Sequence, residues 1–303
     1  MSSIAPQHLL GAHMERELRS QPALWLRAAE LAAAGTALPQ HGERVAIVGC
    51  GTSWFVGQAF AALREELGLG ETDAFAASEA PLAHRNYDSV IMLSRSGTTS
   101  EVLKLAAELR GTTRLIGILG DEASPLPSAV DSVVALPFAD EQSVVQTRFA
   151  TTALALLRAH LGHDLEAVAA QAREALDTAP GEHLIAAEQL TFLGTGWSVG
   201  IAHEAALKLR ESAQAWTESY PAMEYRHGPI AIAAPGRAVW VFGDAPEGLK
   251  VEVARTGAHF EDSALDPLAD LVRAHQLSLA RARALGVDPD APRNLSRSVI
   301  LNE

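Results

Sequence analysis

Short runs of consecutive apolar residues recur along the chain, and each is followed by a loop of small residues and then by a helical pattern. Residues 44–49, 90–93 and 190–193 form such runs, and the stretches after their loops place apolar residues at helical spacing. Strands that are apolar at every position are buried on both faces, which is typical of parallel sheets covered by helices. The pattern therefore predicts an α/β fold with doubly wound parallel sheets.

The sequence of strand, loop and helix starts twice. The first half is completed by further expected strands at 114–119 and 132–136 and by expected helices at 145–161 and 163–178. The dipeptide Pro180-Gly181 then interrupts the pattern before the second start. We therefore expect two αβα domains, one over residues 1–180 and one over residues 181–303.

The ends of these two domains have features of their own. An opening helix is expected over residues 8–34, broken at Pro22. The second domain is expected to be compact, because the stretch 241–268 holds few residues for the usual strand, helix and strand returns. A short match between residues 48–53 and 193–198 makes an internal duplication plausible.

Composition excludes several classes of protein. The chain has 303 residues, 48% of them hydrophobic, and 24 Lys and Arg against 37 Asp and Glu, which gives a net charge of −13. This is the composition of a globular chain, and its charge repels nucleic acids and anionic membrane surfaces. It has no signal-peptide pattern and no apolar run of about 18 residues. We expect a cytoplasmic protein without nucleic-acid or membrane partners.

Metal and cofactor chemistry is not expected. Cys50 is the single cysteine, so neither an internal disulfide nor a cysteine-rich zinc site can form. Only His160 and His163 approach ligand spacing, and Gly162 between them is typical of a helix end. The loops also lack the complete glycine and lysine patterns of ATP and NAD sites.

Two loops that follow predicted strands are rich in hydroxyl groups and glycine. In an open parallel sheet, ligands bind beyond the carboxyl ends of the strands. The loops offer backbone N–H groups, a helix N-terminus and the hydroxyls that a phosphate monoester needs, from Ser53, Ser94, Ser96 and Thr99. A second interpretation stays open, because Thr98 and Glu101 have the spacing of a capping box and serine-glycine turns are common between strands and helices.

A charged stripe lies on the helix expected after residue 196. Glu204, Lys208 and Glu211 share one face, and alanine and leucine residues form the opposite face. Periodicity alone therefore predicts that the charges face solvent and support the helix by a Glu204–Lys208 pair. His227 lies in a turn-rich segment, where an exposed loop histidine is the default interpretation.

Seven motifs in order resemble the tandem sugar isomerase (SIS) family, above all the isomerase half of glucosamine-6-phosphate synthase and the tagatose and galactosamine phosphate isomerases. The resemblance spans nearly the whole chain. The motifs lie at 13–18, 50–53, 94–99, 144–147, 204–211, 224–229 and 292–298. The resemblance implies two flavodoxin-like SIS domains, a sugar phosphate as ligand and no cofactor.

The resemblance also implies roles for individual residues. The phosphate loops correspond to Ser53, Ser94, Arg95, Ser96 and Thr99, and further substrate contacts to Gly51, Thr52, Val144, Gln146 and Ser296. By the same resemblance Glu211 moves a proton between C1 and C2 of the open-chain sugar, and His227 opens the sugar ring. Lys208 lies one turn before Glu211, from where it is expected to orient that carboxylate or to stabilise an enediolate. In the family this histidine comes from the neighbouring subunit, which implies a homodimer with shared active sites.

Two departures from the family pattern bear on the reaction. Arg95 stands where the synthase has a glutamine, and Arg297 stands where it has a lysine that can form an imine. By its position in the motif Arg297 is a candidate catalytic residue, but a guanidinium does not deprotonate, so imine chemistry at Arg297 is in doubt. Because the sequence has no glutaminase domain, glutaminase activity is not expected.

Two functions remain open from the sequence. The first is a phosphosugar isomerase that acts on a hexose or amino-hexose 6-phosphate, with or without deamination. The second is a phosphosugar-binding regulatory module without catalysis. Such regulators usually carry a basic helix-turn-helix region, whereas the roughly 44 residues before the first strand contain few basic residues.

Overall fold

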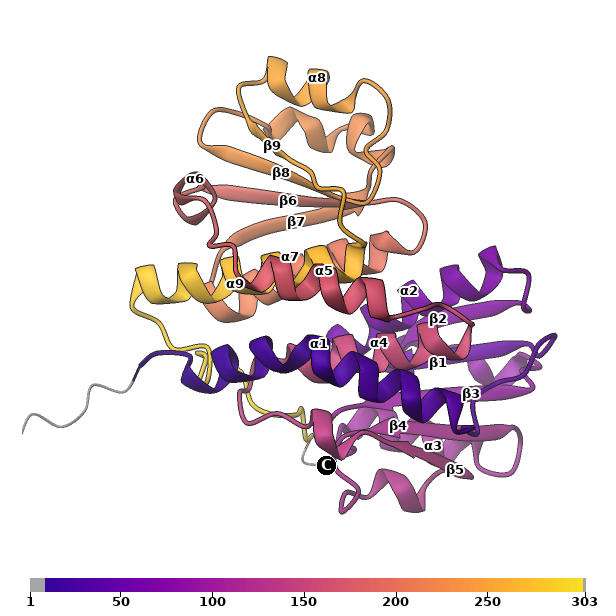
Figure 1. The fold of residues 1–303 in the computed structure, drawn as a ribbon. Helices are drawn as coiled ribbons and strands as arrows, with labels where there is room; N and C mark the ends of the chain where they lie inside the picture. Colours follow the sequence, from indigo (N-terminus) through magenta and orange to yellow (C-terminus); the bar gives the residue numbers. More distant parts are fainter. Residues whose placement is uncertain (1–8, 302–303) are drawn as a thin grey trace, which may run out of the picture.

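Two separate parallel sheets form the framework of the protein, and helices fill the space between them (Figure 1). The structure is a computed structural model that describes residues 9–301. The first sheet contains β1 (Val45–Gly49), β2 (Thr72–Ala76), β3 (Ser89–Ser94), β4 (Arg114–Leu119) and β5 (Ser132–Ala135). The second contains β6 (Gln189–Gly194), β7 (Trp216–Pro221), β8 (Arg237–Phe242) and β9 (His259–Glu261).

The two sheets repeat one strand order. The first runs β2-β1-β3-β4-β5 and the second β7-β6-β8-β9, and every pair of neighbours is parallel. The chain order therefore reverses between β1 and β3, and again between β6 and β8, and these are the points where doubly wound sheets bind ligands. This confirms the predicted α/β class with two sheets of the flavodoxin-like order, the second of them smaller.

The apolar runs in the sequence became the buried central strands. All residues of β1, β3 and β6 are buried, because helices cover both faces of each sheet. The helices are α1 (Ala12–Ala33), α2 (Thr52–Glu66), α3 (Ser100–Leu109), α4 (Arg148–His160), α5 (Glu166–Leu176), α6 (Glu182–Ile185), α7 (Ser198–Ala213), α8 (Leu249–Arg255) and α9 (Pro267–Leu285). The division at residue 180 falls in the connection between α5 and α6 and stays a prediction.

The opening helix does not break where the sequence predicts a break. Residue 8, its expected start, lies outside the described residues, and α1 continues through Pro22. Proline cannot donate a hydrogen bond to the carbonyl of Leu18 four residues earlier. The side chain of Gln21 donates to that carbonyl instead, at 3.0 Å from Nε2 to the oxygen, so the helix keeps a partner at the proline.

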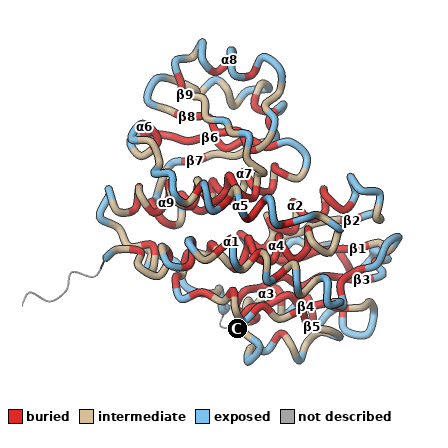
Figure 2. The backbone as a smooth tube through the Cα atoms, in the orientation of Figure 1, coloured by how far each residue is buried: buried red, intermediate tan, exposed pale blue. Residues whose placement is uncertain are grey.

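One apolar core joins the two sheets. Buried side chains run continuously from Ile47 in β1, through α4 and α7, to Phe192 and Trp240 in the second sheet. Figure 2 shows these buried segments in red in the central layers and in both sheets. Smaller clusters lie on the outer face of each sheet, under α3 and under α8. No helix among residues 9–301 is both long enough and apolar enough to cross a membrane.

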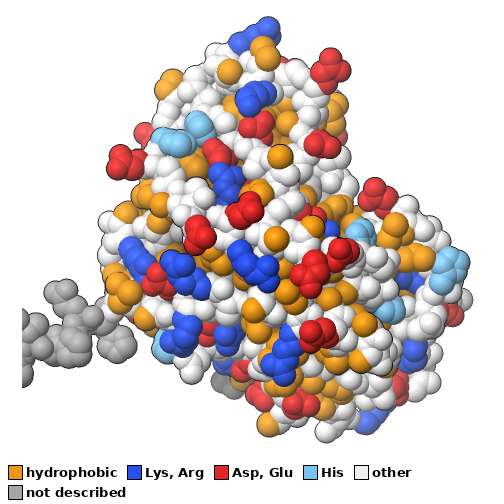
Figure 3. Space-filling model, viewed as in Figure 1, with side chains coloured by type: hydrophobic (Ala, Val, Ile, Leu, Met, Phe, Trp, Pro, Cys, Tyr) orange, Lys and Arg blue, Asp and Glu red, His pale blue; other side chains and the backbone are white. Residues whose placement is uncertain are grey.

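The face in Figure 3 carries both signs of charge. Lys and Arg side chains lie interspersed with Asp and Glu side chains along the helices between the sheets. On this face the basic side chains do not form the continuous stripe that a nucleic-acid backbone would require.

Helix α7 crosses α2 at very short range, and a glycine makes this approach possible. A Cβ atom at Gly200 would lie 2.5 Å from the backbone oxygen of Phe55 and 2.8 Å from the backbone nitrogen of Ala59. Both of these atoms belong to the backbone of α2, so a side chain at residue 200 would push the two helices apart.

The substitution Gly200→Ala is therefore expected to destabilise the protein by about 1–3 kcal/mol, because an added methyl group must displace backbone rather than a flexible side chain. Denaturant unfolding of both proteins measures the difference. The control Ala170→Leu adds more volume on the exposed face of α5 and should change stability by less than about 0.5 kcal/mol. An equal effect of the two substitutions would contradict the tight crossing.

Candidate active site

The loop after β1 brings the first sheet into contact with α7. Thr52 and Ser53 begin α2 and are 4% and 5% exposed, whereas Gly51 is exposed and has a φ of 53°. A Cβ at Gly51 would lie 3.6 Å from Cδ2 of Leu207 in α7. The helix of the second half that carries the charged stripe therefore lies directly against the predicted phosphate loop of the first half.

The loop after β3 is organised by its own hydroxyl groups. Ser94 Oγ accepts a hydrogen bond from the backbone N–H of Gly97 at 3.1 Å and lies 3.3 Å from Thr99 Oγ1. Ser96 Oγ accepts from the backbone N–H of Thr98 at 3.2 Å and from its hydroxyl at 3.0 Å. These bonds gather the predicted hydroxyls at the N-terminus of α3.

The capping-box interpretation of this loop is wrong. The N-cap of α3 is Thr99, and its side chain does not cap the helix. The hydroxyl of Thr98 bonds to Ser96 and lies 2.9 Å from Ser298 Oγ, while Oε2 of Glu101 is buried and has no hydrogen-bond partner in the described chain. The hydroxyl of Thr98 therefore contacts the C-terminal segment instead of capping α3, and the spacing of residues in the sequence does not reveal this contact.

The buried side chain of Arg95 connects three segments of the chain by hydrogen bonds. It is 2% exposed, and its Nη atoms donate to the backbone oxygen of Ser143 at 3.0 Å and to that of Arg297 at 2.8 Å. Burial lowers the pKa of this guanidinium, and the nearby carboxylate of Glu141 opposes that shift. Arg95 therefore holds the β5–α4 connection and the C-terminal segment against the β3 loop.

Two buried glutamates that the sequence analysis missed shape the β5–α4 connection. Glu141 accepts hydrogen bonds from the backbone N–H groups of Thr147, Arg148 and Phe149, at 2.6, 2.8 and 3.1 Å, and so caps α4. Glu17 of α1 accepts from the N–H groups of residues 142 and 143. Backbone N–H donors satisfy both buried carboxylates, that of Glu141 at the N-terminus of α4 and that of Glu17 in the β5–α4 connection, which explains why both tolerate burial.

These bonds position two predicted sugar contacts. Val144 is half-buried, and its N–H donates to the backbone oxygen of Asp290 at 3.4 Å. Gln146 is also half-buried, and its Oε1 has no partner among the described residues. Glu141 lies close enough to Lys208 to raise the pKa of that ammonium, so this connection approaches α7.

The charged stripe of α7 is buried, so the predicted outer face is wrong. The side chains of Glu204 and Lys208 are 2% and 1% exposed, and that of Glu211 is 22% exposed. Helix α7 contacts α2, α9, β6 and β7, which cover the positions of Glu204 and Lys208 and leave Glu211 partly exposed. The i, i+4 pattern identified a common face correctly but could not show what covers it.

Lys208 lies between the two carboxylates. Its Nζ is 2.5 Å from Oε2 of Glu211 and 3.6 Å from Oε1 of Glu204, and neither oxygen of Glu204 has a hydrogen-bond partner in the described residues. Burial raises the pKa of Glu204 to about 7, with Lys208 opposing and Glu211 adding to the shift. Burial also opposes the charge on Lys208, but the two carboxylates outweigh it and raise the pKa of the ammonium.

The two carboxyl groups at this centre therefore differ in how readily they take up a proton. One ammonium faces two carboxylates, so the carboxylate without a hydrogen bond takes up a proton most readily, and that one is Glu204. His275 of α9 adds no charge, because burial and the Lys208 ammonium lower its pKa to about 3. Lys208 and Glu211 remain as the charged pair, with Glu211 at the solvent edge.

The C-terminal segment lies along the β5–α4 connection. Nη2 of Arg297 lies 2.6 and 2.8 Å from the carboxylate oxygens of Asp140, and Nη1 donates to the backbone oxygen of Glu141. Ser296 is exposed, and its hydroxyl donates to the backbone oxygen of Ser298 at 2.8 Å. Arg297 thus anchors this segment, while its predicted catalytic role stays a prediction.

His227 is not brought into the same cluster. It ends a short 3-10 helix, η5 (Glu224–His227), is exposed, and makes no side-chain hydrogen bond in the described part of the chain. No contact given by the structure joins it to Glu211. The expectation that a neighbouring subunit supplies this histidine stays a prediction.

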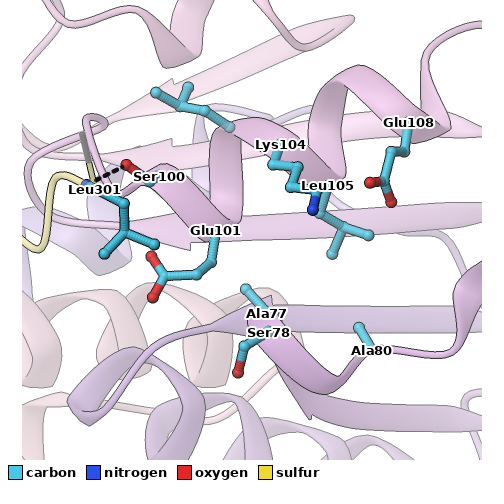
Figure 4. A pocket seen from close by; sticks show the side chains of 10 residues that line it. Ala77, Ser78, Ala80, Ser100, Glu101, Lys104, Leu105, Glu108 and Leu301 are labelled. Atoms are coloured by element: carbon cyan, nitrogen blue, oxygen red, sulfur yellow. Dashed lines mark hydrogen bonds between the residues drawn. The ribbon is translucent and has the colours of Figure 1, made fainter. Parts of the chain in front are cut away.

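Two cavities lie near these elements. One of about 210 Å³ is lined by Glu211, Ser212 and Gln214 of the second half and by residues 287–293. Another of about 670 Å³ lies between α3 and the 3-10 helix η1 (Ala77–Glu79), and Glu101 points into it (Figure 4). The larger cavity contains none of the predicted site residues, so residue chemistry and not volume places the candidate site beside Glu211.

Comparison with known proteins identifies the family. Residues 40–161 match the SIS domain. The chain therefore contains an SIS domain over these residues. The second sheet repeats the strand order of the first, as two consecutive domains of this kind would.

Curated relatives of the SIS-domain protein are about twice its length. It is 26% identical to a glutamine–fructose-6-phosphate aminotransferase [isomerizing] of Sulfurisphaera tokodaii, over 86% of this chain and 50% of the relative. It is 32% identical to the enzyme of the same name from Gloeobacter violaceus, over 85% of this chain and 52% of the relative. The chain therefore spans about half the length of these relatives.

Solved structures share the fold. Glucosamine-6-phosphate deaminase from Thermotoga maritima superposes with a TM-score of 0.82 at 23% identity, covering 96% of this chain and 100% of that one. Tagatose-6-phosphate ketose/aldose isomerase from Escherichia coli gives a TM-score of 0.78 at 20% identity, covering 97% of both chains. At these identities the likeness shows the fold alone.

The raised pKa of Glu204 makes stability depend on pH in a defined window. The native state keeps the proton up to a pKa of about 7, whereas the unfolded chain releases it near 4.5, so stability falls as the pH rises through this window. Glu204→Gln removes this titration. The stability of the variant relative to wild type should therefore rise by up to about 1.4 kcal/mol per pH unit between these values.

Denaturant unfolding at intervals across this pH range measures the difference. Glu166→Gln on the exposed first turn of α5 is the control and should run parallel to wild type. Parallel curves for Glu204→Gln and wild type would mean that Glu204 is ionised throughout.

Proposed function

We propose that the protein interconverts the aldose and ketose forms of a hexose or amino-hexose 6-phosphate through an enediol(ate). The observation that supports this best is the Glu211 carboxylate, which is bonded to the buried Lys208 ammonium and borders a cavity of about 210 Å³. A carboxylate held in one orientation can take a proton from one carbon and return it to the next.

In the proposed reaction Glu211 removes the proton from C2 of the open-chain aldose. The electron pair of that C–H bond forms the double bond of the enediolate, and negative charge develops on the oxygen at C1. The proton of the C2 hydroxyl passes to the oxygen at C1, and Glu211 returns its own proton to C1, so that C2 becomes the carbonyl carbon of the ketose. Lys208 fixes one Glu211 oxygen, and its positive charge stabilises the enediolate.

The phosphate end of the substrate is assigned to the two hydroxyl-rich loops. Their hydroxyls and the N-terminus of α3 neutralise a phosphate without a metal ion. The groups assigned to the phosphate are Ser53, Ser94, Ser96 and Thr99, and those assigned to the sugar are Gly51, Thr52, Val144, Gln146 and Ser296. Arg95 acts indirectly here, since its Nη atoms hold the neighbouring backbone.

The names of the similar proteins support this substrate class. The aminotransferases, the deaminase and the isomerase each name a 6-phosphate of a hexose or an amino-hexose. Release of ammonia from an amino-sugar phosphate therefore belongs with the proposal. Hydrolysis of glutamine by a thiol does not, because burial raises the pKa of Cys50, the single cysteine, to about 11 and keeps it protonated near neutral pH.

Deuterium exchange tests the enediol step directly. Ketose, aldose and amino-sugar 6-phosphates are incubated with the protein in D₂O, and proton NMR follows deuterium entry at C1 or C2. We expect one sugar to exchange, and Glu211→Gln to slow its exchange by roughly 100-fold or more while the sugar still raises the melting temperature. Glu108→Gln, in the larger cavity of Figure 4, is the matched control and should keep full exchange.

The outcomes separate the candidate functions. Full exchange by Glu211→Gln would remove Glu211 as the base, and loss of exchange by Glu108→Gln would move the site to the larger cavity. If no sugar exchanges but one raises the melting temperature, the protein is a phosphosugar-binding module without catalysis. Ammonia release from an amino-sugar phosphate distinguishes a deaminase from a plain isomerase.

We further propose that the active protein is a homodimer in which His227 of one subunit opens the sugar ring at the site of the other. The exposure of His227 supports this assignment, as does the lack of side-chain hydrogen bonds from it to residues 9–301 of its own chain. An imidazole can both donate and accept a proton, which suits proton transfer to a ring oxygen.

Complementation of two inactive variants tests the shared site. Glu211→Gln and His227→Ala are each expected to be inactive on the cyclic sugar. After subunit exchange in an equal mixture, about a quarter of the sites combine both native residues, so about a quarter of wild-type activity should return. Activity that stays at the level of the separate variants would show that Glu211 and His227 of one chain serve the same site.

A further inference from the structure

Two histidines and a glutamate meet at the surface of the second half, away from Glu211 and the phosphate loops. His183 belongs to α6, which precedes β6, and His259 and Glu261 belong to β9, the edge strand of the sheet. Figure 3 shows histidine side chains, in pale blue, gathered on this part of the surface. The mechanism proposed above does not use these residues.

The three side chains present their ligand atoms to one another. Nε2 of His183 lies 3.1 Å from Nε2 of His259, which lies 2.9 Å from Oε2 of Glu261. One ligand atom from each of the three residues falls within 4.8 Å of the others. His259 and Glu261 are two positions apart on one strand, so their side chains lie on the same face.

The backbone at Gly181 permits the position of the His183 ring. A Cβ at this glycine would lie 2.5 Å from Cε1 and 2.8 Å from Nδ1 of His183. The ring therefore folds back over residue 181, which turns its Nε2 towards His259. This arrangement depends on a residue without a side chain at position 181.

We propose that His183, His259 and Glu261 bind a Zn²⁺ ion. Two imidazole nitrogens and one carboxylate oxygen form a ligand set that zinc accepts, with water completing a tetrahedron. Zinc bonds of about 2.0–2.1 Å at tetrahedral angles separate ligand atoms by about 3.3 Å. The two separations from Nε2 of His259, 3.1 and 2.9 Å, are close to this value, and the three ligand atoms lie within 4.8 Å of one another. Side-chain rotations would bring the three atoms around one ion.

The surrounding charges keep the carboxylate available. Glu261 also pairs with Arg273 through its other oxygen, and Arg273 lies 2.8 Å from the carboxylate of Asp270. The two carboxylates outnumber the single guanidinium, which leaves a negative charge for a divalent cation, and Oε2 remains for the metal.

The site would tie two distant parts of the chain together. His183 lies 76 residues before His259, just after the connection between the two halves. A cavity of about 180 Å³ beside the cluster is lined by His183 and Glu261 together with residues of that connection, which leaves room for a water ligand. Bound zinc would therefore fasten the edge strand β9 to the start of the second half and stabilise it.

Zinc binding to the untagged protein tests this inference. Equilibrium dialysis followed by metal analysis should find about one Zn²⁺ per chain at neutral pH, and zinc should raise the melting temperature. His183→Ala and His259→Ala should each weaken binding at least tenfold and abolish the rise in melting temperature. Co²⁺ in place of zinc should give the visible absorption of a tetrahedral site, and acid should release the metal as the imidazoles are protonated.

His84→Ala, an exposed histidine of the first half, is the control and should bind zinc like wild type. The melting temperature of each variant without metal shows whether it folds, and Glu261→Gln provides a third probe that retains both histidines. Binding that is equal in wild type, His183→Ala and His259→Ala would overturn the inference. A wild-type protein that binds no zinc at micromolar concentrations would overturn it as well.

Discussion

A fully buried ammonium, that of Lys208, imposes the main constraint on this structure. A lone charge in such a place would cost several kcal/mol, so carboxylates must accompany it into the interior. Glu204 and Glu211 do so from the same helix, one turn before and one turn after it. The site depends on the burial of Glu204 and Lys208 in α7, because among the three residues of the charged stripe only Glu211 is partly exposed to solvent.

Enclosure of α7 in turn depends on the packing between the two halves. Gly200 brings α7 against the backbone of α2, and Leu207 lies against Gly51, at the loop that follows β1. The first half contributes hydroxyls and a helix N-terminus, and the second contributes the charged helix. Only the contact between the two halves brings the charged helix α7 against the loop that follows β1.

Buried polar ties connect the site to distant parts of the chain. Arg95 bonds to the backbone at Ser143, in the β5–α4 connection, and at Arg297, in the C-terminal segment. Glu17 of α1 bonds to the β5–α4 connection, and Glu141 joins that connection to the start of α4. The C-terminal segment also bonds to the β3 loop through Ser298. Removal of one partner from such a bond leaves a buried group unsatisfied, which costs more than the bond itself contributes. The ties therefore fix the geometry of the loops as well as stabilising them.

The sequence by itself determined the fold class, the strands β1, β3, β4, β5 and β6, and the loops that carry the hydroxyls, whereas it did not reveal β2, β7, β8 and β9. Continuous apolar strands require cover on both faces, and that local requirement predicts α/β layers, strand positions such as 114–119 and loops at 50–53 and 94–99. Motif resemblance also selected Glu211 and Lys208, although periodicity placed them at the surface.

Only the tertiary structure decided which charges are buried and which distant groups meet. Helical spacing shows that Glu204, Lys208 and Glu211 share a face, but burial depends on α2, α9 and the second sheet, which come from other parts of the chain. Three further contacts also depend on the folded chain. Gln21 bonds to the carbonyl that Pro22 leaves without a donor, and Thr98 contacts Ser298 instead of capping α3. His183 lies beside His259, 76 residues later in the sequence. The local sequence determines which side chains share a face of a helix or strand. Packing between distant segments determines which of these side chains are buried, and burial in surroundings of low polarity strengthens the interactions of a charge.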